Sequence, residues 1–461
     1  MNESTIANAT TTHASPRASL AAIGALIRQR HLFDPVGEHV TIRQKTVQYT
    51  PTDKLYDALI AILAGAHGLV EVNTRLRSDL GLQRAFGRRA CAEQSVIQDT
   101  LDASSAENVQ QLEQALDQIY RQHSQGYHHA YQQDWQVLDA DMSGMPCGKK
   151  AAFASRGYFA RQRNRRGRQL GRVVASRYAE VVVDRLFLGT IQLVSALPTL
   201  LLAAERTLEL DAAKRAQTIV RVDAGAGSVD AINWLLRRCY QVHAKDYSSQ
   251  RAATLAASVV RWVDDPRIEG RQIGWVIEQA SAYIRPVVRI AVRCRKKNGQ
   301  WGIGVLISTI DPQTIVILTD LSPSEWVHPD AELLAYVYFY DQRGGGVETT
   351  LKGDKQGLGI TKRNKKRFEA QQMLVLLGSL AHNLIVWARH WLVAEQPKLR
   401  HYGIVRMVRD VLQVSGTLIV DGMGHLVAII LNQAAPLVRG LVAALARLLA
   451  PAHIAVNLGQ T

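Results

Sequence analysis

Two short apolar runs that each end in an aspartate constrain the fold of this chain most. Val137–Asp141 alternates apolar and polar residues and runs into a glycine at 144, and Ile219–Asp223 repeats the design before Gly225-Ala226-Gly227. Such alternation is typical of β-strands, and Ser228 is placed to cap a following helix. Strand-end carboxylates beside glycine turns are common binding positions in α/β sheets, although they also serve as plain caps. The two runs predict an α/β protein with Asp141 and Asp223 at strand ends.

Asp139 is a rival to Asp141 for the first of these positions. It precedes Asp141 by two residues, so both side chains lie on the same face of the strand. We choose Asp141 because it is closer to the strand end, and the choice between the two stays open at this point.

A third acid, Glu348, lies in the stretch Tyr338 to Lys355, YFYDQRGGGVETTLKGDK. An apolar strand-like run and three glycines precede it, and a short helical pattern follows. If residues 347–352 are helical, Glu348, Lys352 and Lys355 share one face. On an ordinary surface helix this arrangement is an ion-pair ladder worth a few tenths of a kcal/mol.

Together the three segments resemble the DDE transposases of bacterial insertion sequences, in the branch whose last acid lies in a Tyr/Arg/Glu/Lys signature. The family pattern Tyr-x2-Arg-x3-Glu-x6-Lys is matched from residue 340 to residue 355, with one extra residue between Arg and Glu. The family's first acid matches Asp141, and its second, in RxDxGxG, matches Asp223. The resemblance covers residues 20–420. Gly353 also departs from the pattern, because glycine weakens a helix. The residues that match the signature are Tyr340, Arg343, Glu348 and Lys355.

The resemblance implies metal-dependent DNA strand cleavage followed by strand transfer, with excision by cut and paste. Asp141, Asp223 and Glu348 would be the catalytic residues and the ligands of two Mg²⁺ ions, for which Mn²⁺ can substitute. Tyr340, Arg343 and Lys355 would grip phosphates or a displaced base. The implied partners are double-stranded DNA, both transposon inverted-repeat ends and target, and a second copy of the chain in a homodimeric synaptic complex.

The resemblance also implies the fold class: an α/β protein whose RNase H-like core carries a β-rich insertion and follows a helical N-terminal domain. With the family in mind, the patterns predict three core strands, a helix, a strand, a helix and a strand. The expected boundaries are a disordered tail at 1–20, a helical DNA-binding or dimerisation domain at 21–130, core at 131–246, β-rich insertion at 247–321, core again at 322–394 and a C-terminal region at 395–461.

Composition favours a nucleic-acid partner. Lys and Arg number 55 against 40 Asp and Glu, which gives a net charge of +15 and favours a polyanion. The four cysteines form no CxxC pair, so we expect neither a zinc site nor a disulfide framework. The polar N-terminus lacks a secretion signal, and the apolar tract at 437–456 is broken by charged residues. We expect a cytoplasmic, nucleoid-associated bacterial protein with no membrane segment.

Three basic segments are candidate DNA contacts. Residues 288–307 predict a β-hairpin with one apolar face and one arginine face, and a basic run at 156–172 joins the first two core strands. A third run, at 362–367, follows the Glu348 block. A charge run is usually a solvated loop, but these segments accompany the proposed acids, so we predict phosphate contacts. The predicted contact residues are Arg289, Arg293 and Arg295 of the hairpin and Arg163, Arg165 and Arg166 of the first run.

Two other functions fit the same residues. One is a DNA-binding protein derived from a transposase that no longer cuts, and the other is a metal-dependent nuclease that does not integrate its product. Cleavage of labelled transposon ends separates cutter from binder, and recovery of joined product separates transposase from nuclease.

Overall fold

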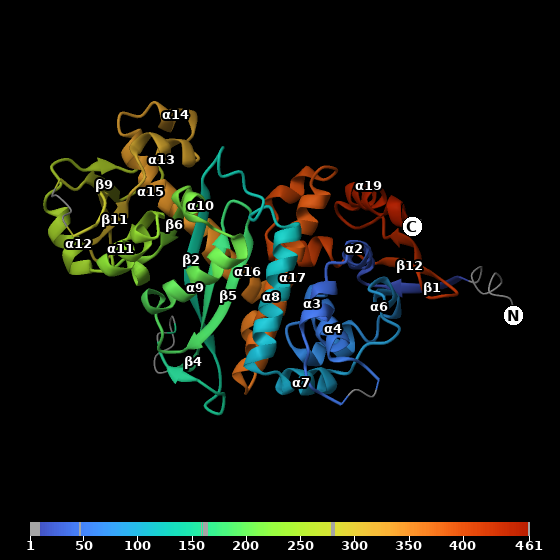
Figure 1. The fold of residues 1–461 in the computed structure, drawn as a ribbon. Helices are drawn as coiled ribbons and strands as arrows, with labels where there is room; N and C mark the ends of the chain where they lie inside the picture. The colour runs from blue at the N-terminus through green and yellow to red at the C-terminus, as the bar shows by residue number, and fades with distance from the viewer. Residues whose placement is uncertain (1–9, 46–47, 158, 160–164, 278–281, 460–461) are drawn as a thin grey trace. The chain divides into compact units, whose positions relative to one another are not determined.

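The computed structural model describes residues 10–45, 48–157, 159, 165–277 and 282–459, drawn as a ribbon in Figure 1. The chain forms two compact units, each assembled from separate stretches of sequence. The first comprises Met1–Ser124, Met145–Ala154 and Thr350–Thr461, and the second comprises Gln125–Gly144 and Ser155–Thr349. Both proposed strand-end acids and Glu348 lie in the second unit.

The second unit is built on one ten-stranded sheet. Its strand order is β3-β4-β2-β6-β7-β11-β10-β9-β8, and β5 pairs with β4. The β2–β6 and β6–β7 pairs are parallel, whereas β4–β5 and the pairs from β7 to β8 are antiparallel. The strands are β2 (Gln136–Pro146), β3 (Ser155–Arg156), β4 (Arg166–Ala175), β5 (Glu180–Leu188), β6 (Thr218–Val222), β7 (Gln241–Lys245), β8 (Val263–Asp264), β9 (Arg271–Trp275), β10 (Val288–Arg295) and β11 (Trp301–Ser308).

The order of elements along the core agrees with the sequence prediction. Strands β2, β4 and β5 are followed by a helix, then β6, a helix and β7. Ser228 caps the second of these helices as predicted, because its hydroxyl accepts the Ala231 N–H. The helices of the second unit are α9 (Leu193–Leu208), α10 (Ala212–Ala216), α11 (Val229–Arg237), α12 (Ser249–Ala256), α13 (Pro312–Leu318), α14 (Pro323–Trp326) and α15 (Ala331–Arg343).

The predicted β-rich insertion continues the core sheet. Strand β11 pairs with β7 through Leu306↔Lys245, and β10, β9 and β8 follow outward. The predicted hairpin is present, with Val288 opposite Ser308 and Arg295 opposite Trp301. The insertion therefore shares its backbone hydrogen-bond ladder with the core.

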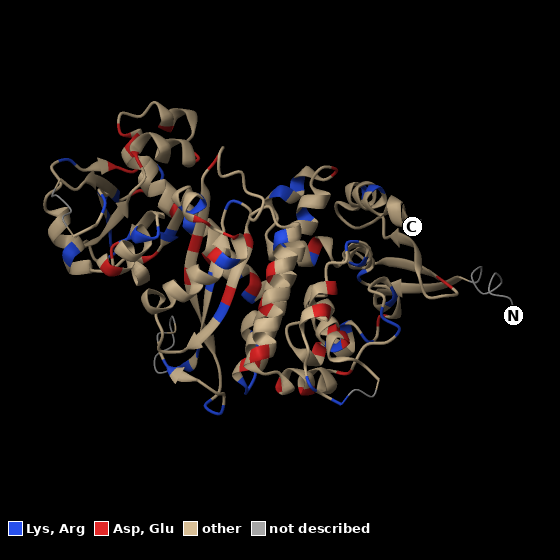
Figure 2. Ribbon diagram, viewed as in Figure 1, with Lys and Arg blue, Asp and Glu red and all other residues tan. Residues whose placement is uncertain are grey.

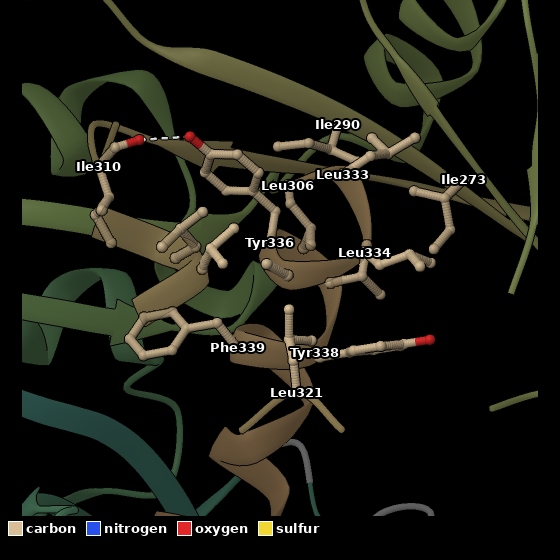
Figure 3. Packing of buried hydrophobic residues seen from close by; sticks show 14 of the residues in the cluster. Ile273, Ile290, Leu306, Ile310, Leu321, Leu333, Leu334, Tyr336, Tyr338 and Phe339 are labelled. Carbon is tan, nitrogen blue, oxygen red and sulfur yellow. Dashed lines mark hydrogen bonds between the residues drawn. The ribbon is translucent and has the colours of Figure 1, made fainter. Parts of the chain in front are cut away.

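The apolar run before the glycines is a helix, which corrects the strand-like interpretation of residues 338–340. They lie in α15, whose sides are buried against β9, β10, β11 and the α13–α14 segment (Figure 3). The Tyr336 hydroxyl donates to the Ile310 carbonyl at 2.6 Å within this core. A helix buried on most sides lacks a polar face, so its periodicity resembles that of a buried strand.

The first unit combines helices with a small sheet. Residues 10–20, expected in a disordered tail, form β1 (Thr10–Ser15) and the start of α2, and β1 pairs with β12 of the C-terminal region. The sheet order is β1-β12-β13-β14, with β12 (Gly416–Asp421), β13 (Leu426–Leu431) and β14 (Ala455–Leu458). Its α-helices of four residues or more are α2 (Ala18–Gln29), α3 (Asp34–His39), α4 (Pro51–Leu63), α5 (Val72–Arg75), α6 (Leu80–Ala85), α7 (Gln94–Ala103), α8 (Ala106–His123), most of α16 (Thr349–Gly357), α17 (Phe368–Leu392) and α19 (Val438–Leu449).

Helix α17 is long and apolar enough to cross a membrane by length and composition, and it is the only such helix among the residues that the structure describes. Its most apolar window is entirely buried within the protein, and it packs against α4, α7 and α8. This is the behaviour of a core helix.

Candidate active site

The parallel pairing of β2 with β6 builds the base of the site. Asp139 lies opposite Arg221 in this ladder. Side chains alternate between the faces of a strand, so Asp141 and Asp223 come two residues later on the same face. The two strands thus present two rows. The lower row holds Asp139 and Arg221. The upper row, just past the last ladder pair Ala140↔Val222, holds Asp141 and Asp223.

The two residues of the lower row form a buried ion pair with each other. The Arg221 guanidinium donates from Nε and Nη2 to the two Asp139 carboxylate oxygens at 2.6 and 2.9 Å. Ser176 Oγ donates to Asp139 Oδ2, and the Asp139 side chain is fully buried. Because these partners occupy Asp139, Asp141 is the better candidate for the first acid.

The carboxylate groups of the upper row have oxygen atoms available to bind a further ligand. Asp141 accepts the Met142 N–H at 2.7 Å, and Asp223 accepts the Gly225 N–H at 2.8 Å, where it begins the short turn Ala224–Ala226. Both residues are half-buried. Asp223 directly follows β6, whereas Asp141 lies in the middle of β2, which continues to Pro146, so the prediction that Asp141 ends a strand is wrong.

A π-helical turn connects α15 to the third acid. Helix α15 ends at Arg343, the turn spans Gly344–Glu348, and α16 (Thr349–Gly357) follows. Arg343 Nη1 lies 2.9 Å from Glu348 Oε1, although the two residues are five positions apart. In an α-helix the matching spacing is four, and a π-turn contains one residue more. The turn kinks at Gly346, which has non-helical φ and ψ, and brings Glu348 back to Arg343 across these five positions.

Arg343 joins two of the three acids. Its side chain is almost fully buried, and Nη2 lies 3.1 Å from Asp141 Oδ2 and donates to the Ala140 carbonyl at 3.2 Å. Burial opposes its charge, but Asp141 and Asp223 outweigh that effect and raise the pKa of Arg343. Glu348 is the open side of the site, with 57% of its side chain exposed.

The acids act on one another electrostatically. Burial raises the pKa of Asp141 to about 6, with further contributions from Asp223 and Glu348 that the Arg343 guanidinium opposes. Burial also raises the pKa of Tyr340, and Asp223, Glu348 and Asp141 add to the rise. Asp141, Asp223, Glu348, Tyr340 and Arg343 thus lie within electrostatic range of one another.

The chemistry of this cluster fits a hard divalent cation, whereas its present geometry is held by an arginine. Two aspartates and a glutamate supply the oxygen ligands that Mg²⁺ prefers. Within the described ranges, however, no three Asp, Glu, His or Cys side chains lie close enough together to hold a metal ion. The Arg343 guanidinium lies between Asp141 and Glu348 and supplies the positive charge there.

The other predicted contacts are spread along the chain. Lys355 lies in the part of α16 that belongs to the first unit, so its place relative to the acids is not described. Arg163 lies outside the described residues. Arg165 is exposed just before β4, and Arg166 is half-buried at the first position of that strand.

The arginines of β10 do not form a uniformly open face. Arg289 is buried, Arg293 is half-buried and Arg295 is exposed. The Arg293 guanidinium lies between the rings of Trp262 and Trp301, at 4.0 and 4.6 Å from their centroids, and donates to Gln272 Oε1. Exposed positive charge on this hairpin is therefore concentrated toward its tip, at Arg295, Lys296 and Lys297.

One basic residue near the cluster escaped the sequence prediction. Lys245 ends β7, and continuation of the β6–β7 register places it beside Asp223. It lines a groove of about 580 Å³ together with Lys296, Trp301 and Tyr340. The sequence does predict this strand, because Val242-His243-Ala244-Lys245 alternates apolar and polar residues as 137–141 and 219–223 do. The residue at the end of this strand, however, is a lysine and not an aspartate.

Asp354, the next acidic residue after Glu348 in the sequence, has a partner in the first unit. It is fully buried in the first unit, and Asp354 Oδ1 lies 2.7 Å from His382 Nδ1 of α17.

No family model matches the sequence, and no curated protein matches it. Among solved structures, a cryo-EM structure described as the piggyBac transposase synaptic complex with hairpin DNA is similar to this chain with a TM-score of 0.44 and 11% identity. The match covers 87% of this chain and 82% of that one.

Proposed function

We propose that this chain is a DDE-type transposase that binds transposon ends and catalyses metal-dependent DNA strand cleavage and strand transfer. The observation that carries the proposal is the upper row, in which Asp141 and Asp223 lie side by side just past the last pair of the parallel β2–β6 ladder, while the turn at residues 344–348 brings Glu348 to the guanidinium that contacts Asp141. Supporting it is the strand order β5-β4-β2-β6-β7, which is the order expected of an RNase H-like core.

Asp141, Asp223 and Glu348 would hold two Mg²⁺ or Mn²⁺ ions, which activate the attacking water or 3′-hydroxyl and stabilise the leaving oxygen. The chain's own residues do the rest. Burial and the neighbouring acids destabilise the ionised Asp141 carboxylate more than Arg343 stabilises it, which favours uptake of a further cation. Arg343 and Tyr340 border the same space and are available to DNA phosphates once the acids are neutralised by metal.

The proposal includes the finer features that the family resemblance implies. These are a bacterial insertion-sequence origin, excision by cut and paste, duplex inverted repeats and target DNA as substrates, a homodimer in the synaptic complex and a cytoplasmic location. The net charge of +15 supports a DNA partner.

A second candidate is binding without cleavage. It is favoured by Arg343, which already neutralises Asp141 and Glu348 in a way that a non-cutting protein would retain.

The deciding experiment uses end-labelled duplexes that carry the inverted repeats bordering the coding sequence, with and without Mg²⁺. The wild-type chain should nick and join them. Glu348→Gln preserves size but removes one ligand charge, so we expect unchanged end binding and nicking below detection. Wild-type binding without any Mg²⁺-dependent product would establish the non-cutting alternative, and cleavage without joined product would establish a nuclease.

A further inference from the structure

The lower row of the site joins three elements through one side chain. Besides its two bonds to Asp139 on β2, Arg221 of β6 donates from Nη1 to the Phe339 carbonyl of α15 at 2.6 Å. Only 3% of the Arg221 side chain is exposed. Phe339 precedes Arg343 by one helical turn, so this guanidinium fixes the end of α15 that leads into the π-turn.

The partner of Arg221 contacts the π-turn itself. Gly346 lies so close to Asp139 that an added Cβ would overlap Asp139 Oδ2 and lie 3.2 Å from Ser176 Oγ. Asp139 and Arg221 therefore contact the chain on both sides of Arg343, at Gly346 and at Phe339. Glu348 follows Gly346 by two residues.

Stability alone does not explain such a pair. Removing two charges from water costs several kcal/mol per ion, and well-packed apolar residues often replace a buried pair without loss. What the pair does supply is fixed direction, because the guanidinium is planar and its donors form a rigid fork. The pair lies one row below the acids, about 6–7 Å along the strands.

We propose that Arg221 is a positioning residue for the reaction. This role rests on the function proposed above. In it, Arg221 and Asp139 set the distance between the Asp141–Asp223 row and Glu348. Neither residue contacts the reacting atoms. Their effect reaches the metal site through α15 and the π-turn.

The chain offers a matched control for this role. Arg172 of β4 and Asp184 of β5 lie opposite each other in the same sheet, both fully buried, with Nε and Nη2 at 2.7 and 2.6 Å from the carboxylate oxygens. Arg172→Lys and Arg221→Lys make the same chemical change, but only the second lies beneath the acids.

The test measures Tb³⁺ luminescence of the full chain, excited through its aromatic residues, and counts as site binding the signal that Asp223→Asn removes. We expect Arg221→Lys to weaken Tb³⁺ binding at least about tenfold and to slow single-turnover cleavage, with the Kd for DNA unchanged. Arg172→Lys should keep wild-type Tb³⁺ affinity, even where both variants lose thermal stability.

Equal Tb³⁺ affinity in Arg221→Lys and Arg172→Lys, whether both weakened or both intact, overturns the inference. Should Arg221→Lys fail to fold, Ser176→Ala removes one bond to Asp139 and leaves the ion pair. It should weaken Tb³⁺ binding in the same direction, and wild-type affinity in that variant also overturns the inference. A wild-type chain that neither binds Tb³⁺ at this site nor cleaves DNA refutes the proposed function instead.

Discussion

At the scale of single residues, Asp141 carries a charge that the free protein does not fully compensate. Its pKa of about 6 lies above the ordinary aspartate value, chiefly because it is buried. A group with a raised folded-state pKa stabilises the protein below its unfolded pKa and loses that contribution as pH rises through the folded pKa. The ionised carboxylate therefore lowers the free energy of unfolding above pH 6.

We predict that Asp141→Asn raises thermal stability in metal-free buffer at pH 8. A shift of about two pKa units corresponds to roughly 1–3 kcal/mol. The advantage over wild type should shrink as pH falls through 6 and vanish near pH 4, where Asp141 is neutral in both states. Thermal unfolding across this pH range measures it, and a variant less stable than wild type at pH 8 would contradict the prediction.

Arg343 supplies the positive charge between Asp141 and Glu348, so it competes with a cation for these acids. We predict that Arg343→Gln raises the Mn²⁺ affinity of the DNA-free chain about five- to tenfold, since one charge at this range is worth about 1 kcal/mol or more. Arg343→Lys keeps the charge and serves as the control. Calorimetric titration decides, and unchanged or weaker Mn²⁺ binding in Arg343→Gln would show that the arginine does not compete.

At the scale of elements, the three glycines of the turn at residues 344–348 differ in how much space surrounds them. Cβ atoms added at Gly344 and Gly345 meet no other atom within 4 Å, whereas one at Gly346 overlaps Asp139. Gly345→Ala should therefore be neutral or stabilising by up to about 1 kcal/mol, because alanine restricts the unfolded chain. Gly346→Ala should lower the thermal midpoint and weaken site binding of Tb³⁺. Equal midpoints for the two variants would mean that the contact with Asp139 is relaxed at little cost.

Sequence patterns predicted the elements of the core better than their contacts. Alternation and glycine turns were enough to find β2, β6 and their acids. The Asp139–Arg221 pair could not be found this way, because the residue opposite Asp139 depends on β2 and β6 being neighbours. The sequence pattern also did not identify α15 as a helix. Because most sides of α15 are buried, its apolar residues do not recur with the helical period. The three glycines mark a break, and the backbone does kink at Gly346, whose φ and ψ are non-helical.

At the scale of the whole molecule, the positive charge is unevenly distributed. Residues 309–335 contain five acidic residues and no Lys or Arg, so the remainder carries 55 basic and 35 acidic residues, a net charge of +20. Figure 2 shows α13 and α14 within this stretch without a basic residue. DNA should therefore approach the second unit away from the α13–α14 segment.

The hairpin tip is the part of the insertion best suited to phosphates, because Arg293 is held between tryptophans and Arg289 is buried. We predict that replacing Arg295, Lys296 and Lys297 by Gln lowers the salt dependence of duplex binding, by about 0.9 in log-log slope for each phosphate that the tip no longer binds. Fluorescence anisotropy over a salt series measures it. A charge-matched variant of the exposed Lys398, Arg400 and Arg439 in the first unit should keep the slope. Identical slopes in the two variants would exclude the hairpin from the DNA track.

The π-turn has a consequence for how such a chain changes over generations. Adding one residue to a regular helix turns everything beyond it by about 100° around the axis. Here the five-residue turn kinks at Gly346, and the Glu348 carboxylate meets Arg343 five positions before it. A length change in this segment can thus be inherited without redirecting the acid. A search of distant sequences should therefore allow the Arg and the Glu to lie either four or five positions apart, rather than require one fixed spacing.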